Sequence, residues 1–170
     1  VRAFKDGAFQ LAVQSGAPVI PIAIDGTADT LPKHGLVMEN PVEGIVRGIF
    51  FNQGHVCCAG SRLLVQESVH DVVLEKLLRR IDRIRVGDPM DKNTDLGAIN
   101  SREQLARIEA LCVAGETEGA VRHQSSCDLP GNGFWFRPTV FSGVGQSHRI
   151  AREEIFGPVL SVLTFRTPEE

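Results

Sequence analysis

The sequence predicts an α/β domain with a largely parallel sheet and flanking helices. Two kinds of pattern in the sequence lead to this fold class. Short apolar stretches typical of strands alternate along the chain with stretches whose apolar residues recur every three or four positions, as in amphipathic helices. Strands separated by helices favour parallel pairing. The 170 residues are 42% hydrophobic and 23% charged, which is enough for one soluble domain with a core.

The first forty residues show the pattern of a short helix followed by a strand. The amphipathic stretch 8–15 ends at Gly16, where glycine commonly terminates a helix. Residues 17–24 are apolar, and their prolines suit the start or the edge of a sheet. Residues 27–41 show little periodicity, so we expect a loop and a boundary there.

The next part of the chain predicts a helix, a strand and a long helix. Residues 43–51 place apolar side chains on one helical face, and residues 63–66 are strand-like. Ser68 and Asp71 resemble a capping box at the start of the following helix. The predicted apolar stripe of that helix comprises Val69, Val72, Val73, Leu77, Ile81 and Ile84.

The last part of the chain repeats the alternation. Ser101 and Gln104 are predicted to cap a second long helix, and Cys112 lies on its apolar face, so we expect Cys112 in the core. A short helix is expected near residues 149–153. Strands are predicted at residues 120–123, 134–141 and 159–165.

Charge and cysteine content narrow the functional classes. The net charge is −3 and basic residues form no cluster, so neither nucleic acid nor an anionic membrane is an expected partner. No apolar run approaches the ~20 residues of a membrane span. The four cysteines show no C-x-x-C or zinc-type spacing, so we expect no metal and a reducing, cytoplasmic location.

The stretch at residues 50–62 predicts a reactive thiol. It places Cys57 and Cys58 between Gly54 and Gly60, where a helical pattern gives way to a strand. A thiolate is the attacking form of cysteine, and its pKa of about 8.5 falls at a helix end or beside a cation. The alternative is a pair of buried, inert thiols, since free cysteine is among the most buried residue types.

This stretch, in the form Phe-x-Asn-Gln-Gly-x-x-Cys-x-Ala-Gly, resembles the active-site signature of the NAD(P)-dependent aldehyde dehydrogenases. Further matches follow in the order of that family. They lie at residues 62–67, 86–89, 96–99, 136–141 and 153–159. The resemblance implies an incomplete aldehyde-dehydrogenase-like catalytic domain at residues 43–170.

The resemblance also implies a covalent mechanism. Cys57 matches the nucleophile of the family, and Cys58 matches a neighbouring non-catalytic position. The thiolate would attack a small-molecule aldehyde, hydride would pass to NAD or NADP, and water would hydrolyse the resulting thioester. Glu154 matches the residue that binds the nicotinamide ribose, and Phe156 matches the residue that contacts the nicotinamide. Full-length relatives are expected to be homo-oligomers.

His55 departs from the signature, because the family usually has Gln at this position. A Cys–His pair with Cys57 is one interpretation, but residues two apart rarely face one another on a helix, so a tolerated substitution is simpler. The remaining histidines have no spacing that suggests metal ligands and are expected at the surface. They are His34, His70, His123 and His148.

Several parts of the family machinery have no match in these residues. The general base in a Glu-Leu-Gly-Gly motif, the oxyanion-binding Asn and any Gly-x-Gly-x-x-Gly pattern are absent from the sequence. We therefore expect a partial catalytic domain that is inactive, or nearly so, alone. A non-catalytic remnant or assembly partner with an inert Cys57 is the alternative. The sequence leaves open which aldehyde is oxidised and whether NAD or NADP is used.

The opening residues resemble a different family. Residues 1–36 are similar to the later part of a glycerolphosphate (lysophosphatidic acid) acyltransferase domain, although its His-x-x-x-x-Asp and Phe-Pro-Glu-Gly motifs are missing. Acyl transfer in phospholipid synthesis is thus a further alternative function. The predicted organisation is an acyltransferase-like fragment and linker at residues 1–42, joined near residues 39–42 to the partial dehydrogenase domain at residues 43–170.

Overall fold

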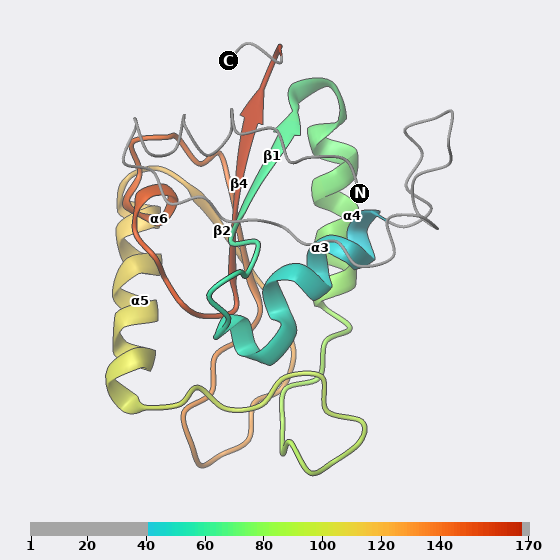
Figure 1. Cartoon of the computed structure of the whole chain (residues 1–170), viewed down its shortest axis with the longest axis vertical. Coiled ribbons are helices and arrows are strands. Elements are labelled where there is room, and N and C mark those ends of the chain that lie inside the picture. The colour runs from blue at the N-terminus through green and yellow to red at the C-terminus, as the bar shows by residue number, and fades with distance from the viewer. Residues whose placement is uncertain (1–40, 168–170) are drawn as a thin grey trace, which may run out of the picture.

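The computed structural model describes residues 41–167, and the fold below concerns that part of the chain (Figure 1). The predicted helix at residues 8–15, the strand at residues 17–24 and the acyltransferase-like similarity at residues 1–36 lie outside the described residues, as does His34.

Four strands form one mixed sheet in the order β1-β4-β3-β2. β1 (Arg62–Gln66) pairs in parallel with β4 (Val159–Phe165), and β4 pairs in parallel with β3 (Thr139–Ser142). β2 (Val121–Gln124) is antiparallel to β3 at one edge. The predicted α/β fold with a largely parallel sheet is confirmed.

Helices cover both faces of the sheet (Figure 1). α3 (Pro41–Phe50) and α4 (His70–Ile81) lie on one side, and α5 (Arg102–Thr117) and α6 (Arg149–Arg152) lie on the other. Alternate residues of β4 face opposite sides: Leu160 and Val162 belong to the core with α3 and α4, while Val159 and Leu163 belong to the core with α5 and α6.

The start of α4 differs from its prediction. A 3-10 turn, η2 (Glu67–Val69), precedes the helix, and Val69 occupies the N-cap position without a side-chain cap. The predicted capping box is therefore wrong, because the turn places Ser68 within it rather than at the cap. Leu77 and Ile81 of the apolar stripe are buried, whereas Val69 and Val72 near the helix start are about half exposed.

The start of α5 follows its prediction. The Ser101 hydroxyl oxygen accepts a hydrogen bond of 3.1 Å from the backbone N–H of Gln104. Cys112 is fully buried, as predicted, and burial raises the pKa of its thiol to about 12. The predicted strand at residues 134–141 is shorter in the structure, because regular pairing begins only at Thr139, after Pro138, which has no N–H to donate.

The surface prediction for histidines holds only in part. His70, His123 and His148 are all of intermediate exposure, and the His123 Nε2 lies 2.8 Å from the Ser142 hydroxyl oxygen. Within residues 41–167, no cluster of three His, Cys, Asp or Glu residues could hold a metal ion. The described helices include none that is long and apolar enough to cross a membrane.

Candidate active site

The loop at residues 52–61, here called the cysteine loop, carries Cys57 and Cys58. It begins with three residues in the left-handed region of backbone conformation. Asn52, Gln53 and Gly54, in the 3-10 segment η1 (Phe51–Gly54), have φ values of 48°, 57° and 72°. This conformation is unfavourable for non-glycine residues, so other contacts must stabilise it. The Asn52 side-chain amide donates to the His55 carbonyl at 3.2 Å, and the Gln53 side-chain amide donates to the Ala98 carbonyl at 3.1 Å.

Two glycines allow this loop to touch a segment far away in the sequence. A Cβ at Gly54 would lie 2.1 Å from the carbonyl oxygen of Gly157, so no other residue fits at this contact. A Cβ at Gly157 would in turn lie 2.6 Å from the Ile108 side chain on α5. The cysteine loop therefore lies directly against the segment at residues 153–157.

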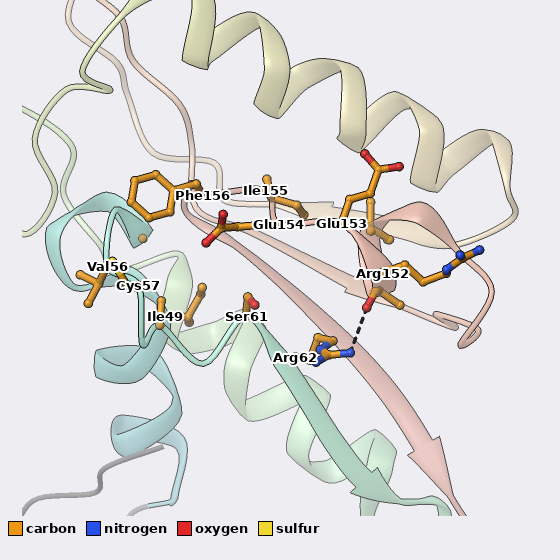
Figure 2. A pocket seen from close by; sticks show the side chains of 15 residues that line it. Ile49, Val56, Cys57, Ser61, Arg62, Arg152, Glu153, Glu154, Ile155 and Phe156 are labelled. Atoms are coloured by element: carbon orange, nitrogen blue, oxygen red, sulfur yellow. Dashed lines mark hydrogen bonds between the residues drawn. The ribbon is translucent and has the colours of Figure 1, made fainter. Parts of the chain in front are cut away.

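A pocket of about 230 Å³ lies where these segments meet (Figure 2). The three residues singled out from the sequence, Cys57, Glu154 and Phe156, all line it. Further lining comes from the end of α3, from the residue before β1 and the first residue of β1, and from α6. These residues are Ile49, Ser61, Arg62, Ile150, Ala151 and Arg152. The folded chain thus brings together two motifs that are widely separated in the sequence.

The two adjacent carboxylates have different surroundings. Figure 2 shows the Glu154 carboxylate directed toward the side of the pocket that carries Cys57, whereas the Glu153 carboxylate points away. Glu153 instead pairs with Arg149, with N–O distances of 2.6 and 3.2 Å, and this pairing lowers the pKa of its carboxyl group. Of the two, Glu154 is the one available to a ligand in the pocket.

The four cysteines differ in exposure. Cys57 and Cys58 are exposed, Cys127 is of intermediate exposure and Cys112 is buried, and all four are free thiols. The interpretation of Cys57 and Cys58 as a buried pair is therefore wrong. Because these two residues form a turn between α3 and β1, their side chains are kept out of both hydrophobic clusters.

Side chains of α5 hold the segment that carries Glu154 and Phe156. The Gln104 side-chain amide donates to the carbonyls of Ile155 and Phe156, both at 2.9 Å, and the Arg107 guanidinium donates to the Glu154 carbonyl at 3.1 Å. Three consecutive carbonyls are thereby satisfied. Sequence reasoning identified Gln104 only as part of a helix cap and missed Arg107, because contacts to distant backbone atoms leave no periodic pattern.

The side of the pocket formed by α6 is held by residues of the sheet. The Arg62 guanidinium donates to the Ala151 carbonyl at 3.1 Å, and the buried Ser161 hydroxyl donates to the Ile150 carbonyl at 3.0 Å. Both acceptors belong to α6, which directly precedes the two glutamates. The position of this short helix therefore depends on β1 and β4, and sequence reasoning also missed this role of Arg62 and Ser161.

His55 contacts the aromatic wall of the pocket. Its ring stacks on Phe156, with 5.3 Å between ring centroids and 17° between the ring planes. Burial lowers the pKa of His55 below its usual value, which favours a neutral imidazole at pH 7. No hydrogen bond joins His55 to Cys57 in the part of the chain that the structure describes. A Cys–His pair is thus not what this arrangement provides.

Comparisons with known proteins agree with these features. The model of the "Aldehyde dehydrogenase family" matches residues 36–170. Betaine aldehyde dehydrogenase of Mesorhizobium japonicum is 39% identical over 137 residues, which are 78% of this chain and 28% of that protein. Retinal dehydrogenase 2 of Taeniopygia guttata is 42% identical over 133 residues, which are 78% of this chain and 26% of that protein.

Solved structures give the same result. An aldehyde dehydrogenase from Bacillus cereus superposes with a TM-score of 0.73 at 34% identity, covering 77% of this chain and 27% of that one. Betaine aldehyde dehydrogenase from Staphylococcus aureus, solved with NAD+, superposes with a TM-score of 0.71 at 36% identity, covering 78% and 27%. The chain spans about a quarter of the length of the curated relatives it matches. It belongs to the aldehyde dehydrogenase family.

Proposed function

We propose that this chain forms the part of an NAD-dependent aldehyde dehydrogenase that carries the nucleophile, Cys57, and two residues for the nicotinamide side of the cofactor, Glu154 and Phe156. The observation that supports this proposal is the shared pocket, because all three side chains line it although they come from two distant motifs. The family membership supports the same reaction class.

The covalent chemistry takes place at the Cys57 sulfur. Its thiolate attacks the aldehyde carbon, a C–S bond forms, and the carbonyl electron pair moves to oxygen. We expect the backbone N–H of Cys57 to donate to this oxyanion, and one such donor is worth roughly 3 kcal/mol. Loss of hydride from the carbon leaves a thioester. Water then breaks the C–S bond, which releases the acid, returns the thiol and requires a base to take up a proton.

The cofactor supplies the acceptor for the hydride. Glu154 suits the nicotinamide ribose, because a carboxylate can accept from both ribose hydroxyls and this carboxylate faces the pocket. The Phe156 ring offers a flat apolar wall beside it. NAD is favoured over NADP because solved relatives, including an aldehyde dehydrogenase from Pseudomonas syringae bound to NAD+ and octanal, contain NAD+. The aldehyde itself is a small molecule.

The proposal also covers the setting of this unit. We propose that residues 43–170 act within a longer catalytic domain that assembles as a homo-oligomer in the reducing cytoplasm. The proposed junction with the preceding segment, near residues 39–42, lies close to residue 36, where the match to the family model begins.

Timed alkylation of all four cysteines tests the nucleophile assignment. The chain is treated with iodoacetamide at neutral pH, quenched at intervals and mapped by mass spectrometry. We expect Cys57 to react faster than Cys127 and much faster than Cys112, whose burial and raised pKa suppress the thiolate. Cys58 is the matched control, because it is the adjacent exposed thiol. Equal rates at Cys57 and Cys58 would favour the assembly-partner alternative, in which Cys57 has no special reactivity.

A further inference from the structure

The contact between His55 and Phe156 joins the cysteine loop to the proposed cofactor side of the pocket. The two rings lie nearly parallel, with 17° between their planes and 5.3 Å between their centroids, which is within the range of favourable aromatic stacking. Phe156 lines the pocket, and His55 belongs to the cysteine loop. The location of this ring pair suggests a role beyond filling space.

The backbone of Phe156 needs support from its neighbours. Its φ is 55°, in the left-handed region that residues with a side chain adopt only under constraint. Gln104 holds the Phe156 carbonyl at 2.9 Å, which fixes the backbone but leaves the ring free to rotate about its side-chain bonds. The ring of His55, stacked on that of Phe156, limits those rotations.

His55 is itself well anchored. Its backbone N–H donates to the Asn52 carbonyl at 2.9 Å, and its carbonyl accepts from the Asn52 side-chain amide at 3.2 Å. Among the described residues, its Nε2 is buried without a hydrogen-bond partner. The ring is therefore held by stacking rather than by a polar contact. A neutral imidazole, favoured by burial, places no positive charge beside a cationic nicotinamide ring.

We propose that His55 is a positioning residue, which keeps the Phe156 ring in the orientation that confines the nicotinamide. This inference rests on the proposed function, since it takes Phe156 to be the nicotinamide contact. Two properties are expected of such a residue. Another aromatic ring at position 55 keeps the Phe156 ring in its orientation, and a side chain without a ring does not.

The first measurement follows the Phe156 ring without any ligand. Its NMR resonances are assigned by comparison with Phe156→Leu. Ring stacking moves the chemical shifts of the Phe156 ring protons upfield. We expect His55→Gln and His55→Ala to return these shifts toward random-coil values, while His55→Phe keeps them upfield. Circular dichroism shows whether each variant is folded. Unchanged Phe156 resonances in a folded His55→Gln chain would overturn the proposal.

The second measurement uses nicotinamide mononucleotide as the probe. Its affinity for the 170-residue chain is obtained by saturation-transfer NMR for the wild type and the three variants. We expect His55→Gln and His55→Ala to weaken binding by about two- to tenfold, the equivalent of one lost aromatic contact, with His55→Phe close to wild type. Equal affinities in all variants would overturn the positioning role alone. Absence of binding by the wild type would overturn the cofactor role of Phe156, and the inference with it.

Discussion

At the scale of single residues, Gly54 links the cysteine loop to the rest of the pocket. Its φ of 72° and its close approach to the Gly157 carbonyl both exclude a side chain. No comparable constraint acts on Gly48 in α3, where an added Cβ would meet no atom within 4 Å. These two glycines make a matched pair for mutagenesis.

We expect Gly54→Ala to destabilise the chain by about 2–5 kcal/mol, because the left-handed backbone and the contact with Gly157 are penalised together. Gly48→Ala should instead stabilise it by about 0.5–1 kcal/mol, because alanine favours helix interiors. Urea unfolding followed by circular dichroism measures both changes. Equal stability of Gly54→Ala and the wild type would show that the loop does not lie against Gly157.

The half-buried His123 predicts a dependence of stability on pH. Burial lowers its pKa in the folded chain, so the unfolded chain, with a His pKa of about 6.5, binds the proton more tightly. The contribution of neutral His123 is therefore fully present above pH 6.5 and is lost as the pH falls below it. His55 acts in the same direction, while Glu43 and Glu153, whose pKa values are lowered from 4.5, titrate at more acidic pH.

Thermal unfolding between pH 7.5 and 5 measures this effect. We expect Tm to fall as the pH drops through about 6 and the fall to be smaller in His123→Gln, whose amide can still bond to the Ser142 hydroxyl. A wild-type profile that rises with acidity, or a variant with the same slope, would contradict the role of His123.

At the scale of elements, α5 supports the proposed cofactor-binding segment. Gln104 satisfies two carbonyls of that segment, and Ile108 packs against Gly157. We expect Gln104→Ala to cost about 1–3 kcal/mol, because partly buried carbonyls lose their donor. The loss should be concentrated near Phe156. Hydrogen exchange measured by mass spectrometry should therefore accelerate in peptides covering residues 153–158.

The exposed Glu103 in the same turn of α5 supplies the control. Glu103→Gln should leave exchange at residues 153–158 unchanged, because in the described part of the chain that segment is held by Gln104 and Arg107 and not by Glu103. Accelerated exchange across the whole of α5 in Gln104→Ala would mean that the helix itself is disrupted and that Gln104 has no specific role in holding the segment.

Local patterns in the sequence predicted most of these elements. The apolar face of α3, the Ser101 cap and the buried strand β4 follow from periodicity and from capping chemistry that act within a few residues. The antiparallel direction of β2, the late start of β3 and the clamp by Gln104 depend on partners distant in the sequence. Motif resemblance predicted the candidate residues, but only the fold places them in one pocket.

At the scale of the whole molecule, the pocket has an unusual place in the sheet. It lies beside Arg62 and Gly157, at the amino ends of the parallel strands β1 and β4. Ligands of open α/β sheets commonly bind at the carboxyl ends, so fold class alone predicts a site at the other edge of the sheet. The site is instead built by turns that precede the strands, fastened by Gly54, Gln104 and Arg62.

The chain spans about a quarter of the length of its relatives. The step of the proposed reaction that is best tested on this chain is therefore the first one, the attack by Cys57. The proposed function depends above all on Cys57 being a nucleophile within this pocket. Attack of its thiolate on an activated ester forms a thioester and releases the alcohol, without an oxidant or a cofactor.

The most direct measurement is therefore acylation by 4-nitrophenyl acetate, followed by mass mapping of the acetyl group. We expect one acetyl group to form on Cys57, Cys57→Ser to abolish it and Cys58→Ser to leave it intact. Acetylation of Cys58 or Cys127 at the same rate as Cys57, or an unmodified Cys57 in the folded chain, would show that Cys57 is not the nucleophile of this pocket.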